Sequence, residues 1–249
     1  TMNRRLEAWN AIFKRKGLAG GLGSLANAVV IKHALRAKAL SPLGGGLPTL
    51  LSLSVSSRCN LRCVGCFTHG YPDAPAQRPD LAVPFLSLAG FQSILAQGGS
   101  RAHILDLTSP GESFLNPEIY SIIALGAHGH GMYVKVDTNG HAIDAEAVVE
   151  SGLGSLTFAL DGFSQESYAS YRVRGEIEKV KTNIEKVSQI AASRGSQLHI
   201  GVKFLVHSRT ENEVETAREY YSQLPNVHFF TDVFIPPGPT WDFRREHPF

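Results

Sequence analysis

The segment from residue 50 to residue 66 reads LLSLSVSSRCNLRCVGC, a strand-like run followed directly by all three cysteines of the chain. An odd, clustered set of cysteines does not suit a disulfide framework, which favours even counts. The spacings between Cys59, Cys63 and Cys66 let one short loop point three thiolates at a single centre. Thiolates prefer zinc or iron–sulfur clusters. The sequence therefore predicts a metal site in the loop after the first strand.

An iron–sulfur cubane normally takes four cysteine ligands. A loop that supplies only three would leave one iron with an open position. Chemistry at a metal centre requires such a position, so we expect the loop of Cys59, Cys63 and Cys66 to be the active site.

The chain has 249 residues, 43% hydrophobic and 18% charged, with a mean hydropathy of −0.06. This length and composition predict one large α/β domain with a substantial core. No apolar run approaches the roughly 20 residues of a membrane span, and residues 1–5 are not followed by the apolar segment of a secretory leader. We therefore expect a cytoplasmic protein without a transmembrane segment, in which the thiols stay reduced.

Charge is distributed unevenly along the chain. Residues 1–45 hold eight Lys or Arg against one Glu, a net charge of +7, whereas the remainder carries −5. Two interpretations stay open: the basic segment contacts an anionic partner such as nucleic acid or lipid, or it is a solvated helix face that docks on the acidic remainder.

Strand-like and helix-like segments alternate from residue 48 onward. Strands are predicted at 50–56, 103–108, 133–137, 156–160, 198–206 and 227–235. Helices are predicted at 88–97, 117–127 with Pro117 in the first turn, 144–151, 164–171, 176–194 and 211–224. This alternation indicates a parallel sheet with right-handed crossovers. Six strands are too few for a closed eight-stranded barrel, so we expect a partial (β/α)6 TIM-like barrel.

Three regions are expected. Residues 1–47 hold two basic helices, at 3–16 and 24–40, and a Gly/Pro-rich linker. Residues 48–236 form the partial barrel, and 237–249 are a C-terminal tail. The N-terminal helices are expected to cover an edge of the sheet, because an exposed edge strand promotes aggregation.

The cysteine loop after a first strand resembles the radical S-adenosylmethionine (SAM) enzymes. The resemblance implies that Cys59, Cys63 and Cys66 hold a [4Fe–4S] cluster whose open iron binds the amino and carboxylate groups of SAM. It further implies that an electron from the cluster cleaves SAM to methionine and a 5′-deoxyadenosyl radical, which abstracts a hydrogen atom from substrate. An external one-electron reductant of flavodoxin or ferredoxin type is also implied.

Further motifs at strand ends resemble the same family. Ser109-Pro110-Gly111-Glu112 is similar to its Gly-Gly-Glu segment, which implies that Gly111 lets backbone approach SAM and that Glu112 accepts from the SAM amine. Asp137-Thr138-Asn139-Gly140 resembles a Thr-Asn-Gly turn, with Thr138 and Asn139 as pocket residues or as part of a purely structural turn.

The segment Leu160-Asp161-Gly162, followed by Glu166, Tyr168, Tyr171 and Arg172, resembles a signature of the SPASM/Twitch branch. The resemblance places Asp161 near the SAM ribose and pairs Arg172, in preference to Arg174, with the SAM carboxylate, since a guanidinium matches a carboxylate. It also implies ribose contacts at residues 206–210 and an adenine contact at 234–236, including Ile235.

Departures from the pattern restrict the expected chemistry. Gly65 stands where most relatives carry an aromatic residue, and Phe67 is a candidate substitute. SPASM and Twitch extensions bind auxiliary clusters through further cysteines, which this sequence lacks. A minimal enzyme, a degenerate extension and a shortened chain all remain open. With three thiols on the cluster none remains as a hydrogen-atom donor, and Tyr71 is the candidate in its place.

Two other classes of function remain open. Cys59, Cys63, Cys66 and His69 form a Cys3His set that suits a structural zinc module. A partner or sensor protein that binds cluster and SAM without turnover is the second alternative. The substrate is not identified by the sequence, and a peptide, a sugar or a nucleoside-type metabolite would each suit the resemblance.

Overall fold

A computed structural model of the chain describes residues 50–64, 66, 84–97 and 102–233. The predicted N-terminal helices, the C-terminal tail, His69, Tyr71, Phe67 and Ile235 lie outside these residues.

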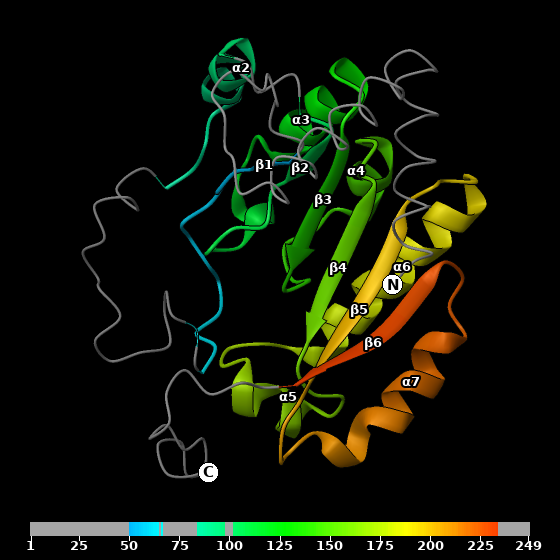
Figure 1. Cartoon of the computed structure of the whole chain (residues 1–249). Helices are drawn as coiled ribbons and strands as arrows, with labels where there is room; N and C mark the ends of the chain where they lie inside the picture. The colour runs from blue at the N-terminus through cyan, green and yellow to red at the C-terminus, as the bar shows by residue number, and fades with distance from the viewer. Residues whose placement is uncertain (1–49, 65, 67–83, 98–101, 234–249) are drawn as a thin grey trace, which may run out of the picture.

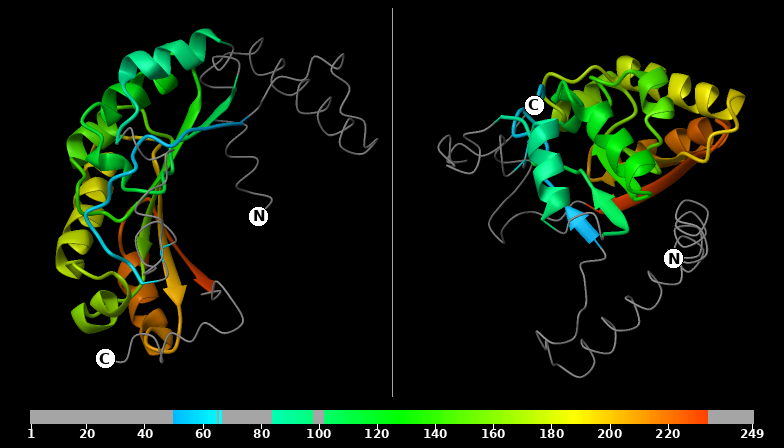
Figure 2. Two further views of the ribbon diagram at one scale, coloured as in Figure 1. Left: turned by 90° about the vertical axis from the view of Figure 1, so that its left-hand side faces the viewer. Right: turned by 90° about the horizontal axis from the view of Figure 1, so that it is seen from above.

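Six parallel strands form one sheet in the order β1-β2-β3-β4-β5-β6. The strands are β1 (Leu50–Ser52), β2 (Ile104–Asp106), β3 (Tyr133–Thr138), β4 (Ser155–Leu160), β5 (His199–Val206) and β6 (Val227–Val233). A sheet whose strands pair in sequence order, with crossovers of one hand, has its helices on one face. Figure 2 shows this arrangement, with the helices outside a curved sheet. The predicted α/β architecture of a partial TIM-like barrel is confirmed.

The sheet is open in the part of the chain that the structure describes. There β1 and β6 are its two edges and do not pair with each other. The strands run parallel, so their carboxyl ends point in one direction, and the ends of β4, β5 and β6 lie near α5 (Figure 1). None of the described helices is both long and apolar enough to span a membrane.

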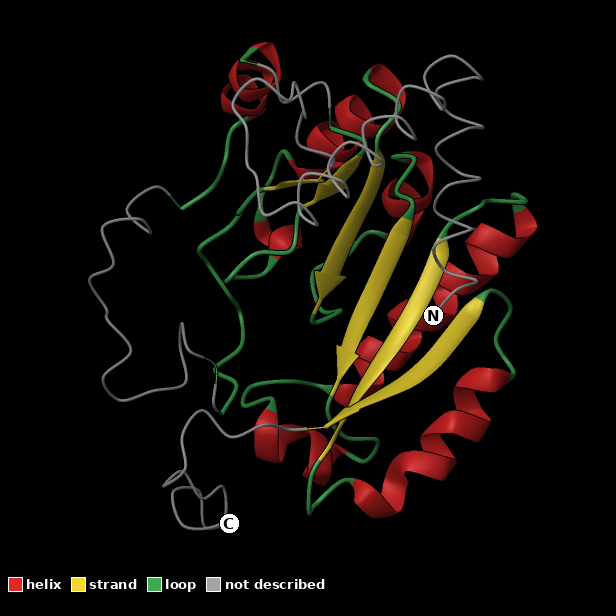
Figure 3. Cartoon of the chain, in the orientation of Figure 1, coloured by secondary structure: helices red, strands yellow, loops and turns green. Residues whose placement is uncertain are grey.

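The helices and helical turns alternate with the strands, as Figure 3 shows. They are α2 (Leu88–Ala96), η3 (Ser113–Leu115), α3 (Ile119–Ala124), η4 (Leu125–Gly129), α4 (Ala145–Glu150), α5 (Gln165–Tyr171), α6 (Ile177–Ser193), η5 (Glu211–Glu213) and α7 (Val214–Ser222). Side-chain caps begin three of the α-helices: the oxygens of Ser87, Asp144 and Ser164 accept backbone N–H groups of the first turn.

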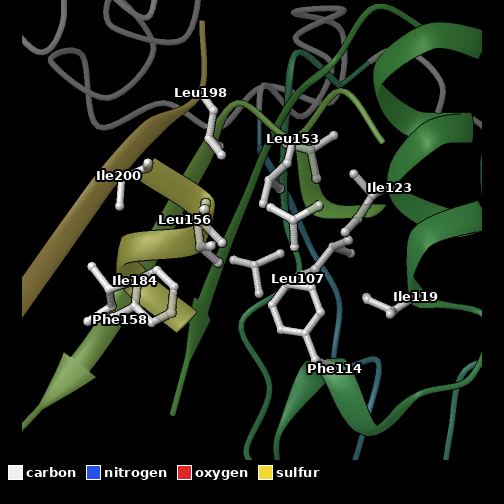
Figure 4. Close-up of a cluster of buried hydrophobic side chains, with 14 of the residues drawn as sticks. Leu107, Phe114, Ile119, Ile123, Leu153, Leu156, Phe158, Ile184, Leu198 and Ile200 are labelled. Atoms are coloured by element: carbon white, nitrogen blue, oxygen red, sulfur yellow. The ribbon is translucent and has the colours of Figure 1, made fainter. Parts of the chain in front are cut away.

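The core lies between the sheet and the helices. Along α6, Ile177, Val180, Ile184 and Val187 recur at helical spacing and are fully buried or nearly so. Figure 4 shows Ile184 beside Phe158 of β4. A large apolar side chain that is fully buried stabilises the fold by about 1.5–3 kcal/mol, so this packing holds the strands at fixed positions beneath the site.

Some predicted boundaries were wrong by a few residues. Strand β1 ends at Ser52 rather than Ser56, since the chain leaves the sheet to form the cysteine loop. Pro117 precedes α3 and is not in its first turn, because the short helix η3 and a turn occupy residues 113–118. After α3 the helix widens into the π-helical turn η4, in which His130 N donates to Leu125 O at 3.1 Å.

Candidate active site

The loop that follows β1 is held at both ends by hydrogen bonds. The backbone N–H groups of Val55 and Ser56 donate to Ser109 Oγ, at 2.9 and 3.2 Å, in the loop after β2. Farther along, Arg62 N donates to Val173 O at 3.1 Å and Val64 N to Tyr171 O at 2.9 Å. These bonds carry the cysteine loop to the C-terminal end of α5 (Figure 1), at the edge of the sheet where α/β barrels build their sites.

The three thiols differ in their surroundings. Cys63 is buried, whereas Cys59 and Cys66 are half-buried. Burial raises the pKa of Cys59 and of Cys63, and the charge of Arg172 acts in the opposite direction on both. Among the described residues, no three Cys, His, Asp or Glu side chains converge as the ligands of a single metal ion do.

Gly111 is required for a close approach within the protein itself. A Cβ atom built on Gly111 would lie 2.3 Å from the carbonyl oxygen of Arg58, the residue before Cys59. Gly111 N donates to Ser56 O at 3.2 Å, and Glu112 N donates to Arg58 O at 2.7 Å. Gly111 therefore lets the loop after β2 pack on the backbone that begins the cysteine motif, a role that the sequence did not predict.

Glu112 is buried, with 3% of its surface exposed. Its Oε1 accepts from Thr138 Oγ1 at 2.8 Å and from Phe114 N at 3.1 Å, and its Oε2 accepts from Asn139 N at 2.8 Å. Burial raises the pKa of Glu112, although the hydrogen bonds from Asn139 and Thr138 favour the ionised form. The carboxylate thus joins the loop after β2 to the turn after β3.

The turn after β3 lies directly against the cysteine loop. The side-chain amide of Asn139 donates to Asn60 Oδ1 at 2.8 Å, and its Nδ2 lies 3.8 Å from Cys59 Sγ. Gly140 has φ of +81°, which favours glycine because it has no Cβ. Its carbonyl accepts from Asn183 Nδ2 of α6 at 2.7 Å.

Asp161 and Arg172 form a buried ion pair between the end of β4 and the end of α5. Arg172 Nη1 also lies 3.5 Å from Cys63 Sγ. Burial by itself would lower the pKa of Arg172, but the charge of Asp161 raises it well above the ordinary value. Arg174 has φ of +72°, beyond the end of α5. The structure therefore brings Arg172, the predicted arginine, to the cysteine loop.

Two supporting residues were missed by the sequence analysis. His141 Nε2 accepts from Glu176 N at 2.9 Å, so its Nδ1 carries the proton and donates to Asn139 O at 3.1 Å. Glu213, after β5, accepts from Phe163 N at 2.7 Å and from Ser167 Oγ at 2.5 Å. Both bind loops that are distant in sequence, and no local motif signals such contacts.

The sequence model of the radical SAM superfamily matches residues 53–220, from the strand end before the cysteines through most of α7. The chain belongs to the radical SAM superfamily. It therefore carries the domain of a radical SAM enzyme, and the predicted family is confirmed. Radical SAM proteins bind SAM and an iron–sulfur cluster, and the cysteine loop is the described segment with thiols to hold one.

Two curated proteins are similar to parts of the chain. GTP 3′,8-cyclase of Chlorobaculum tepidum is 30% identical over 138 residues, which are 54% of this chain and 39% of the relative. AdoMet-dependent heme synthase of Methanosarcina barkeri is 23% identical over 195 residues, 77% of this chain and 52% of the relative. The chain thus spans about half the length, or less, of these two curated relatives.

Solved radical SAM structures share the fold. Native anSMEcpe with bound AdoMet superposes with a TM-score of 0.52 at 19% identity, over 73% of this chain and 50% of the other. Methylornithine synthase (PylB) superposes with a TM-score of 0.53 at 17% identity, over 92% of this chain and 64% of the other. At these identities the likeness shows a shared barrel fold only.

Proposed function

We propose that the chain is a radical SAM enzyme in which Cys59, Cys63 and Cys66 hold a [4Fe–4S] cluster and residues from β2 to α5 bind SAM. The observation that supports it most is the set of contacts around the cysteine loop. Asn139 in the turn after β3 and Arg172 directly after α5 place N–H groups 3.8 and 3.5 Å from the thiols of Cys59 and Cys63. A structural turn would not require side-chain donors from two distant elements to meet the same three-cysteine loop.

The residues suit a cluster better than a single ion. Each thiolate of a cubane binds a different iron. The three sulfur atoms therefore lie farther apart than sulfur atoms that all bind one zinc ion, with Zn–S bonds of about 2.3 Å. His69, the fourth ligand of the alternative zinc module, lies outside the described residues. When bound, the cluster supplies the electron that cleaves SAM to methionine and a 5′-deoxyadenosyl radical.

Glu112 retains capacity to accept a hydrogen bond from the SAM amine. A carboxylate offers about four acceptor positions, and Thr138, Asn139 and Phe114 take three of them. The proposal therefore gives Glu112 two roles: it holds the turn after β3, and its remaining position binds the amine.

Arg172 likewise retains donors for the SAM carboxylate. A guanidinium has about five N–H groups, and Asp161 and the Cys63 thiol each contact one nitrogen. Asp161 lies beside the ribose in this proposal and orients the guanidinium, Thr138 closes the pocket at the end of β3, and Ile235 contacts the adenine. All these groups except Ile235 lie within the described residues.

The match to relatives supports the radical chemistry rather than a particular substrate. GTP 3′,8-cyclase and AdoMet-dependent heme synthase have different names, and each resembles a part of the chain. One fold supports several reactions because the substrate site varies upon it. The proposed substrate is a peptide, a sugar or a nucleoside-type metabolite. The reductant is a flavodoxin- or ferredoxin-type protein. For the basic residues 1–45 both alternatives stand: they bind an anionic partner, or they form a solvated face that docks on the acidic remainder.

The test is anaerobic reconstitution of the chain and of Cys59→Ala, Cys63→Ala and Cys66→Ala. The unsubstituted chain should hold about four irons and four sulfides and release 5′-deoxyadenosine from SAM under dithionite. Each cysteine variant should lose both properties, whereas Ser57→Ala, in the same loop, should keep them. One tight zinc in colourless protein would establish the zinc module instead. A cluster without 5′-deoxyadenosine would favour the non-catalytic partner, and about eight irons would overturn the single site.

A further inference from the structure

Two side chains present N–H groups to the cysteine thiols. Asn139 Nδ2 lies 3.8 Å from Cys59 Sγ, and Arg172 Nη1 lies 3.5 Å from Cys63 Sγ. Asn139 is 5% exposed and the side chain of Arg172 is 16% exposed. Both donors therefore act where water screens them little.

The orientation of the Asn139 amide follows from its other partners. Its Oδ1 accepts from His141 N at 3.0 Å, so its Nδ2 must be the atom that faces Cys59 and Asn60. The backbone of the same residue is held by Glu112 Oε2 at 2.8 Å. A reversed amide would place the Nδ2 donor against the His141 N–H donor and Oδ1 against Asn60 Oδ1, and both hydrogen bonds would be lost.

Arg172 is held to the same loop that it contacts. Its backbone N donates to Tyr168 O at 2.8 Å, and Asp161 binds its Nε. The neighbouring residues Tyr171 and Val173 accept the backbone N–H groups of the cysteine loop. Arg172 and Cys63 are therefore parts of one hydrogen-bonded unit, and the guanidinium is already oriented toward the thiol.

We propose that Asn139 and Arg172 set the reduction potential of the cluster by donating hydrogen bonds to the thiolates of Cys59 and Cys63. This inference rests on the proposed function. Reduction adds negative charge to the cluster and its sulfurs, so N–H donors bind the reduced form more strongly and raise its potential. Asn139 acts through a neutral hydrogen bond, and Arg172 adds a positive charge.

The experiment is a redox titration of reconstituted protein, without SAM, followed by paramagnetic resonance of the reduced cluster. Asn139→Leu should lower the equilibrium constant for reduction about tenfold, which corresponds to about 59 mV for one electron. The matched control is Asn183→Leu. Asn183 donates to Gly140 O in the same turn, and within the described structure it makes no hydrogen bond to a thiol. The cluster of the Asn183→Leu variant should therefore keep the wild-type potential.

Arg172 requires a variant that leaves no unpaired carboxylate. The double variant Arg172→Leu with Asp161→Asn removes both members of the ion pair and keeps the net charge of the pair at zero. It should lower the potential by at least as much as Asn139→Leu. Asp161→Asn alone keeps the guanidinium and removes a negative charge, so it should leave the potential unchanged or raise it.

Each outcome decides the inference. If the wild-type chain forms no cluster, the proposed function fails. If the cluster forms and both Asn139→Leu and the double variant keep the wild-type potential, the tuning role is overturned while the proposed function stands. If Asn139→Leu fails to bind iron, the deciding variant is Asn139→Gln, which retains an N–H donor. Recovery of the cluster in Asn139→Gln supports the donor role. Loss of the cluster in both variants overturns the donor role in favour of a purely structural side chain.

Discussion

The carboxylate of Glu112 and the hydroxyl of Thr138 form a buried hydrogen bond of 2.8 Å. It joins the loop after β2 to the last residue of β3, 26 positions later in the chain. The same carboxylate accepts a hydrogen bond from Asn139 N. Glu112 therefore supports the turn after β3, which lies against Cys59.

Replacing Glu112 by Gln should lower stability as well as weaken SAM binding. Glutamine has one acceptor oxygen for three donors, so one buried N–H or O–H group loses its partner at a cost of about 1–3 kcal/mol. Denaturant unfolding measures this loss, and equilibrium binding measures SAM affinity. Glu118→Gln is the control: Glu118 accepts from Leu88 N at an exposed position and should change stability little. Equal effects of the two substitutions would contradict the supporting role.

Gly111→Ala should disrupt the cysteine loop. Its Cβ would lie 2.3 Å from Arg58 O and 2.8 Å from Arg58 N, and backbone atoms cannot move aside as a side-chain end can. We expect a loss of about 1–3 kcal/mol in unfolding free energy and lower iron content after reconstitution. Gly90→Ala meets only the side-chain atoms Leu86 Cδ1 and Ser87 Oγ at 3.2 Å and should retain iron. Full iron loading of Gly111→Ala would show that the close approach is not required.

Glu213 should make stability depend on pH in the acid range. Burial would raise its pKa, but hydrogen bonds from Ser167 and Ser164 lower it below the ordinary value of about 4.5. A carboxyl group whose pKa is lower in the folded chain stabilises the fold at pH values above its ordinary pKa. This stabilisation is lost as the pH falls through the pKa of the folded chain. Unfolding free energies at pH 7 and below pH 4.5 should therefore differ more for the wild type than for Glu213→Gln. Glu211→Gln, at an exposed neighbouring position, should behave as the wild type.

Tyr168→Phe should raise the unfolding free energy. The Tyr168 hydroxyl is buried and has no hydrogen-bond partner among the described residues. Its removal relieves a desolvation cost, so we expect a gain of about 1 kcal/mol. The opposite result is expected for Tyr120→Phe, because Tyr120 OH accepts from Asp144 N at 2.7 Å. A loss of stability in Tyr168→Phe as large as in Tyr120→Phe would show that the Tyr168 hydroxyl is satisfied after all.

The cysteine spacing and the alternation of strands and helices were sufficient to predict the family and the partial barrel. Both signals are local: Cys59, Cys63 and Cys66 lie in one loop, and each strand or helix shows its period within a short window. Boundaries were less accurate where tertiary contacts determined them. The chain leaves β1 after Ser52, and Val55 and Ser56 then bind Ser109 instead of a neighbouring strand.

The hydrogen-bond partners of the site residues could be identified only from the tertiary structure. The sequence placed Glu112, Asn139, Asp161 and Arg172 at strand ends, and parallel strands bring such ends to one edge. It did not show that Gly111 packs on Arg58, or that Asn139 and Arg172 reach the thiols of Cys59 and Cys63, 80 and 109 residues away. Strand register and core packing decide such contacts within a few tenths of an ångström, and residues far apart in the chain carry no local pattern that records them.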